Sequence, residues 1–184
     1  MFGHTNEPFI LVRDIYAVII PAGEKLLLRE GTPGYITQAL GGSFTIYIEG
    51  NLFRVAGADA DAIGKEIEPP PEIPADASKE DIEKVIWDQL KTCYDPEIPI
   101  NIVDLGLIYR CEITNNNNLK REVEIDMTLT APGCGMGDIL VEDAKEKVEL
   151  IPTIHNVKVE LVFDPPWSQN MMSDEAKLQT GMMY

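Results

Sequence analysis

Apolar side chains between residues 82 and 163 recur in two patterns. Two stretches carry them at helical spacing, and three stretches alternate apolar with polar residues, as half-buried strands do. In chain order the apolar positions are Ile82, Val85, Ile86, Leu90 and Cys93; Leu107, Tyr109, Cys111 and Ile113; Val123, Ile125, Met127 and Leu129; Leu140, Ala144, Val148 and Ile151; and Val157, Val159, Leu161 and Phe163. The middle strand should then turn Glu124, Asp126 and Thr128 outward. This order predicts an α-β-β-α-β domain with a three-stranded mixed sheet and its helices on one face.

Residues with turn and capping chemistry mark the ends of these elements. Ser78-Lys79-Glu80-Asp81 fits a capping box at the start of the first helix. The polar run Asn115 to Asn118 predicts a hairpin loop between the first two strands. Ser173 is a possible cap for a short C-terminal helix.

The first 66 residues have a different pattern, with short apolar runs separated by glycine- and proline-containing turns. Ala17 to Ile20 and Lys25 to Arg29 flank such a turn and predict a hairpin. Further short strands at regular spacing predict a small antiparallel barrel or sandwich. From Gly57 to Ser78 the composition changes, and residues 67–78 read as a proline-rich acidic linker. The expected organisation is an α+β chain with a β-rich domain at 1–66 and a second domain at 79–184.

Charge and cysteine usage narrow the class of protein. The 184 residues carry 31 acidic and 15 basic side chains, a net charge of −16, which disfavours binding to nucleic acid or anionic membranes. Three widely spaced cysteines, without a CxxC pair or a Cys/His cluster, disfavour both a disulfide framework and a closed zinc site. A reducing cytoplasm fits this usage best. We expect neither a secretory signal nor a membrane span.

Cys134 stands in the glycine-rich turn between the middle strand and the second helix. A thiol near the first turn of a helix meets unpaired N–H groups and the positive end of the helix dipole, which lower its pKa. The flanking Gly133 and Gly135 leave room for a ligand to approach the sulfur. A reactive thiol and a small buried cysteine both fit this stretch. Cys93 and Cys111 fall on apolar faces and are expected to be core residues.

A second stretch with chemistry is the loop after the first helix. Pro96 and Pro99 end that helix and hold an extended loop with two carboxylates, Asp95 and Glu97. Either the loop only ends the helix and leaves both acids solvated, or it is a rigid arm that directs them toward a site.

Four segments together resemble a known family. They are Asp95-Pro96-Glu97-Ile98-Pro99, Val103-Asp104-Leu105-Gly106-Leu107-Ile108-Tyr109, Thr130-Ala131-Pro132-Gly133-Cys134, and Pro165-Pro166-Trp167 with Met172-Ser173. In this order they resemble the iron–sulfur assembly domain shared by SufT, the phenylacetate-pathway protein PaaD and the eukaryotic MIP-type targeting factors. The resemblance covers about residues 79–176. The β-rich N-terminal part looks like the extension of the SufT branch.

The resemblance implies a non-enzymatic accessory factor that matures iron–sulfur clusters or delivers them to clients. Its partners would be the assembly machinery and client apoproteins. Asp95, Glu97, Thr130 and Cys134 match the positions of the family's proposed site, with Cys134 as the metal ligand. Ala131 departs from the family, since many members have a second threonine there, so this chain lacks one hydroxyl of a paired-hydroxyl surface.

The chemistry of such a cluster limits what Cys134 can do. Iron–sulfur clusters usually take four thiolates, so one accessible cysteine implies transient binding completed by a second copy, a partner or a small thiol. The alternative is an interaction adaptor that uses its acidic surface, Trp167 and Met172 to contact partners. A thiol enzyme would need a base beside the nucleophile, and the chain has His4 and His155 alone for that role.

Overall fold

A computed structural model describes residues 6–95, 98–115, 120–131, 133 and 135–181. The chain divides into two compact units, Met1–Pro69 and Pro70–Tyr184. The division falls inside the segment 67–78, which has linker composition. The mixed α+β class predicted from the sequence is confirmed, with one large antiparallel sheet and one three-stranded mixed sheet.

Unit 1 is built on a six-stranded sheet followed by a short 3-10 helix. Its elements are β1 (Glu7–Ile10), β2 (Ile15–Ile20), β3 (Lys25–Leu28), β4 (Pro33–Leu40), β5 (Ser43–Ile48), β6 (Asn51–Val55) and η1 (Gly57–Ile63). The strands lie in the order β1-β4-β5-β6-β2-β3, and every pairing is antiparallel. The expected hairpin is β2–β3. The described strands of this unit form one antiparallel sheet, rather than the two stacked sheets of a sandwich.

The core of unit 1 lies on one face of this sheet. Ile36, Ile46 and Phe53 are direct cross-strand partners on β4, β5 and β6, and all three are buried. η1 lies in the stretch whose composition resembles the linker, yet Ala62 and Ile63 pack into this core. Their burial fixes the turn in place despite the acidic residues around them.

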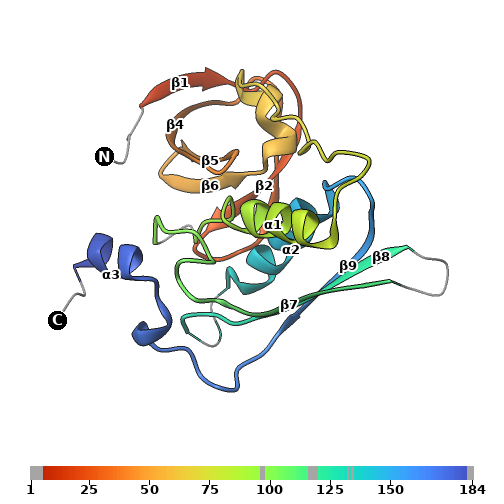
Figure 1. Cartoon of the computed structure of the whole chain (residues 1–184). Helices are drawn as coiled ribbons and strands as arrows, with labels where there is room; N and C mark the ends of the chain where they lie inside the picture. The colour runs from red at the N-terminus through yellow and green to blue at the C-terminus, as the bar shows by residue number, and fades with distance from the viewer. Residues whose placement is uncertain (1–5, 96–97, 116–119, 132, 134, 182–184) are drawn as a thin grey trace. The chain divides into compact units, whose positions relative to one another are not determined.

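Unit 2 has the predicted α-β-β-α-β order with a short C-terminal helix added. Its elements are α1 (Lys79–Leu90), β7 (Ile108–Asn115), β8 (Arg121–Met127), α2 (Gly137–Glu149), β9 (Ile154–Leu161), η2 (Gln169–Met171) and α3 (Asp174–Thr180). β7 pairs antiparallel with β8, and β8 pairs parallel with β9 (Figure 1). The α2 crossover therefore makes the parallel connection expected of a helix between neighbouring strands.

Both long helices cover the same face of this sheet. The inward residues of β8, Val123, Ile125 and Met127, share one buried cluster with apolar residues of α1 and α2. The start of α1 is fixed by the predicted capping box: the Asp81 N–H donates to Ser78 Oγ at 3.1 Å, and the Ser78 N–H donates to Asp81 Oδ2 at 2.9 Å. Ser173 caps α3 in the same manner, accepting from the Ala176 N–H.

Two predicted positions are wrong, both where a strand ends early. Thr128 was expected to point outward but is 1 % exposed, because β8 ends at Met127 and the alternation stops there. Phe163 was expected on the buried face but is 47 % exposed, because β9 ends at Leu161. In each case the alternating pattern runs past the last sheet pairing, so it no longer decides which way a side chain points.

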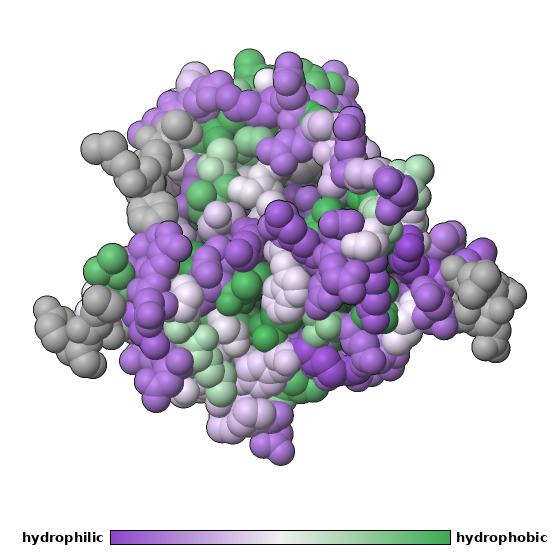
Figure 2. All heavy atoms as spheres, in the orientation of Figure 1, coloured by the Kyte–Doolittle hydropathy of each residue, from purple (hydrophilic) through white to green (hydrophobic). Residues whose placement is uncertain are grey.

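Hydrophilic residues occupy most of the face of the molecule drawn in Figure 2. In the described part of the chain, none of the helices has the length and apolar character needed to span a membrane.

Candidate functional site

The loop between α1 and β7 holds Asp95, the first of the predicted site residues. Asp95 is 9 % exposed, and its Oδ1 accepts a hydrogen bond of 3.2 Å from the Ile98 N–H. Its own N–H donates to the Ile100 carbonyl oxygen at 3.4 Å. Asp95 is therefore a buried carboxylate that shapes its own loop, rather than a solvated acid. Glu97 lies outside the described residues.

The rest of this loop is fixed by backbone hydrogen bonds and one side-chain pair. Ile102 donates its N–H to the Cys93 carbonyl oxygen at 2.9 Å, and Leu107 donates to that of Ile102 at 3.0 Å. Asn101 and Asp104 exchange two hydrogen bonds, of 2.6 and 2.9 Å. Both Ile102 and Leu107 are fully buried, so the loop is anchored in the core at two points.

The strand end that leads toward Cys134 is attached to the same loop. Thr128, just after β8, donates its N–H to the Leu107 carbonyl oxygen at 2.8 Å. Two residues later Thr130 lies half-buried in a bend. The structure thus joins the loop of Asp95 to the stretch of Thr130 through the backbone of Leu107. This backbone hydrogen bond was not predicted from the sequence, although the buried position of Leu107 was.

Cys134 itself lies outside the described residues. Helix α2 begins at Gly137, with the buried Met136 at its N-cap position. A side chain at position 137 would meet the side chain of Leu129 at 2.6 Å, so the start of α2 packs closely on the end of the preceding strand segment. The expected place of Cys134 near the first turn of α2 stays a prediction.

The other two cysteines pack against the core, as predicted. Cys93 is fully buried. Burial, followed by the nearby charge of Glu83, raises the pKa of the Cys111 thiol to about 11. Neither side chain therefore presents an accessible thiolate near neutral pH. In the described ranges, no group of three or more His, Cys, Asp and Glu side chains is arranged to hold a metal ion.

Trp167 and Met172, the predicted partner contacts, make contacts within unit 2. The indole N–H of Trp167 donates to the Leu105 carbonyl oxygen at 2.7 Å. Met172 is 5 % exposed and belongs to the buried cluster of the unit. These contacts give both residues a packing role, and their predicted contact with partners stays a prediction.

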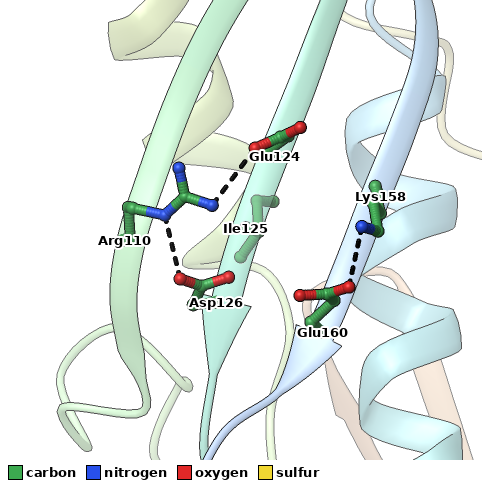
Figure 3. A pocket seen from close by; sticks show the side chains of 6 residues that line it. All are labelled: Arg110, Glu124, Ile125, Asp126, Lys158 and Glu160. Atoms are coloured by element: carbon green, nitrogen blue, oxygen red, sulfur yellow. Dashed lines mark hydrogen bonds and ion pairs between the residues drawn. The ribbon is translucent and has the colours of Figure 1, made fainter.

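The open face of the three-stranded sheet carries a shallow hollow lined by charged residues. Figure 3 shows Arg110 of β7 pointing toward Glu124 and Asp126 of β8, and Lys158 pointing toward Glu160 within β9. The ion-pair distances for Arg110 are 3.1 Å to Glu124 and 2.9 Å to Asp126, and Lys158 lies 2.7 Å from Glu160. Hydrogen bonds to Asp126 and then Glu124 raise the pKa of Arg110. Of the predicted site residues that the structure describes, Asp95 and Thr130 do not line this hollow. Its two cations, Arg110 and Lys158, are engaged by neighbouring carboxylates.

Comparison with known proteins identifies the group to which unit 2 is related. The sequence profile of a family described as iron–sulfur cluster assembly protein matches residues 83–161. A protein of Porphyromonas gingivalis named Fe-S protein maturation auxiliary factor is 44 % identical over 101 residues, which are 55 % of this chain and 92 % of that relative. The chain belongs to the iron–sulfur cluster assembly family.

Two further relatives confirm the SufT-like resemblance within this iron–sulfur cluster assembly family. The Fe-S protein maturation auxiliary factor SufT of Staphylococcus aureus is 39 % identical, over 48 % of this chain and 96 % of its own. The factor YitW of Bacillus subtilis is 32 % identical, over 56 % and 98 %. A crystal structure of a domain of unknown function from Bacillus anthracis has a TM-score of 0.49 and 34 % identity, covering 56 % of this chain and 94 % of that one.

Proposed function

We propose that this chain is a non-enzymatic accessory factor that matures iron–sulfur clusters or delivers them to client apoproteins. The observation that carries the proposal is the 44 % identity across 92 % of a relative named Fe-S protein maturation auxiliary factor. Two more relatives with such names are matched over nearly their whole length. Assembly machinery and client apoproteins are the proposed partners, in the reducing cytoplasm that the cysteine usage predicts.

Cys134 is the proposed ligand for the cluster or its iron, which are the cargo of the protein. The state of the other thiols supports this choice: Cys93 is fully buried, and the pKa of Cys111 is raised to about 11. A metal ligand must be a deprotonated thiolate that the metal can reach. Of the three cysteines, Cys134 is the one whose sequence surroundings favour such a thiolate.

Binding through Cys134 would be labile and shared with another molecule. A cluster usually takes four thiolates, so one chain supplies a minority of its ligands. A homodimer that brings together two copies of Cys134, with a client or a small thiol completing the set, meets this need. Asp95, Glu97 and Thr130 are proposed as neighbours that shape the site, and for Asp95 this fits the hydrogen bond it accepts from its own loop.

The adaptor alternative draws less support from the structure. It assigns partner contacts to Trp167 and Met172, whereas Met172 is buried and the Trp167 indole is bonded to Leu105. The acidic surface is the remaining support for this alternative, and acidic surfaces are common among proteins of many functions.

Anaerobic reconstitution with iron and sulfide tests the proposal. Wild type, Cys134→Ser and the matched control Cys111→Ser would be desalted, and the iron retained per chain would be measured. Each would then be mixed with an apo iron–sulfur protein to follow cluster transfer. We expect retention and transfer by wild type and Cys111→Ser, and loss of both in Cys134→Ser. Equal retention by wild type and Cys134→Ser would contradict the role of Cys134.

A further inference from the structure

The segment between β9 and α3 crosses the loop that carries the candidate site. We call residues 165–173 the C-terminal strap; it follows β9 in the blue part of Figure 1. The indole N–H of Trp167 donates to the Leu105 carbonyl oxygen at 2.7 Å. The backbone N–H of Ser173 donates to the Asp104 carbonyl oxygen at 2.8 Å. Two adjacent carbonyl groups of the loop are thus held by the strap.

A second anchor comes from the strand that follows the loop. The Tyr109 hydroxyl donates to the Pro165 carbonyl oxygen at 2.8 Å, and it lies 3.3 Å from the sulfur of Met171. Pro165 and Met171 lie toward the two ends of the strap, so one hydroxyl contacts both. Met172, next in sequence, is buried in the core of unit 2. The strap is therefore fixed on both sides of Trp167.

The loop and the strap also approach closely at Gly106. The φ angle of Gly106 is +74°, a conformation that glycine adopts far more readily than other residues. A Cβ atom at this position would lie 2.7 Å from the carbonyl carbon of Met171 and closer still to its oxygen. Because the obstacle is backbone, a side chain at position 106 would displace the strap.

The bonds of the loop then connect the strap to both parts of the candidate site. The Leu107 N–H donates to the Ile102 carbonyl oxygen, and the Ile102 N–H donates to the Cys93 carbonyl oxygen. Cys93 lies two residues before Asp95. The Leu107 carbonyl oxygen accepts from the N–H of Thr128, which lies two residues before Thr130. We infer that Trp167 is a positioning residue: by holding the Leu105 carbonyl, it keeps the loop of Asp95 and the strand end before Thr130 in one arrangement. As a statement about cluster handling, this inference rests on the proposed function.

Two variants separate this role from simple packing. Trp167→Phe keeps a ring in place but removes the N–H donor, and Tyr109→Phe removes the other anchor while leaving Trp167 intact. Trp87→Phe is the matched control, because Trp87 is the chain's other tryptophan and packs against the same core from α1. Each protein would be measured in two ways: amide hydrogen exchange of the full chain without cargo, and iron retention after anaerobic reconstitution.

We expect exchange at the Ile102, Leu107 and Thr128 amides to be three- to tenfold faster in Trp167→Phe, since loss of one hydrogen bond raises local opening by about this factor. Tyr109→Phe should act in the same direction. Exchange at Ile125, inside β8, should stay as in wild type, and Trp87→Phe should leave the three loop amides unchanged. Iron retention should fall at least threefold in Trp167→Phe and remain at the wild-type level in Trp87→Phe.

The outcomes separate the two proposals. Unchanged exchange at the loop amides in Trp167→Phe would overturn the positioning role of Trp167, whatever the iron result or the behaviour of Tyr109→Phe. Faster exchange with full iron retention, while Cys134→Ser loses its iron, would also overturn it and leave the proposed function standing. Equal iron retention by Cys134→Ser and wild type would contradict the role of Cys134. In that case the exchange data would still test whether Trp167 positions the loop, with no link to cluster handling.

Discussion

The backbone N–H of Thr128 donates a 2.8 Å hydrogen bond to the carbonyl oxygen of Leu107, at the point where β8 has just ended. The side chain of Thr128 is buried, and its hydroxyl has no hydrogen-bond partner among the described residues. The backbone, rather than the hydroxyl, therefore holds the strand end against the loop of Asp95.

Thr128→Val should stabilise unit 2, because it replaces a buried hydroxyl without a partner by a methyl group of similar size. The expected gain is about 1 kcal/mol in the free energy of unfolding. Urea unfolding followed by tryptophan fluorescence measures it, since Trp87 and Trp167 both lie in unit 2. Thr130→Val, at a half-buried bend, is the control and should change little. A loss of stability in Thr128→Val would show that the hydroxyl makes a needed contact.

Gly106→Ala should destabilise unit 2 by about 2 kcal/mol or more. A positive φ alone disfavours alanine by roughly 1 kcal/mol, and the new Cβ would also push against the Met171 backbone. Gly181→Ala provides the comparison, because Gly181 has φ +71° but, chain neighbours aside, no atom of the described residues lies within 4 Å of its Cβ position. We expect Gly181→Ala to lose about 1 kcal/mol or less. Equal losses in the two variants would argue against a close approach at Gly106.

The three thiols should react at very different rates in the folded protein. With a pKa of about 11, about one Cys111 thiol in a thousand is ionised at pH 8. Its alkylation rate should therefore rise about tenfold per pH unit up to pH 11. Buried Cys93 should react through unfolding alone. Cys134 should supply a fast phase at pH 7.5 that disappears in Cys134→Ser; a fast phase that survives this substitution would contradict the assignment.

The ionised carboxylate of Asp81 in the capping box should stabilise the fold at the start of α1, and this stabilisation should depend on pH. Hydrogen bonds from the Ser78 backbone N–H and then the Ser78 hydroxyl lower the pKa of Asp81 below its ordinary value of 3.8. A lowered carboxyl pKa stabilises the fold above pH 3.8, and this contribution is lost as the pH falls through the folded-state pKa. Asp81→Asn should thus be less stable than wild type at pH 6, with the difference shrinking below pH 3.8. A difference that is constant with pH would rule out this linkage.

Much of unit 2 could be predicted because its periodic stretches carry their own boundaries. Ser78 and Asp81 define the start of α1, and the alternation of Val123, Ile125 and Met127 defines the buried face of β8. The pattern failed at Thr128 and Phe163, since alternation in sequence does not reveal where sheet pairing stops.

Prediction in unit 1 was limited by short elements. β1 was missed because its Glu7–Ile10 run includes a proline and has one buried residue. η1 was hidden by its acidic residues, although Ala62 and Ile63 fix it in the core.

The candidate site could be predicted as a set of segments but not as a structure. Asp95 was singled out for its carboxylate chemistry. The hydrogen bond that this carboxylate accepts from the Ile98 N–H, within its own loop, depends on backbone geometry that no motif specifies. Trp167 was assigned to partner contacts in the adaptor alternative. Its bond to Leu105 links residues 62 positions apart, and periodicity gives no sign of such a contact.

We propose that Cys134 holds iron–sulfur cargo together with thiolates from another molecule. Anaerobic native mass spectrometry of reconstituted wild type, Cys134→Ser and Cys111→Ser measures cargo and stoichiometry at once. We expect a cluster-sized mass increment on a wild-type or Cys111→Ser species that holds two chains or a bound small thiol, and none on Cys134→Ser. The same increment on Cys134→Ser, at the same abundance, would contradict it.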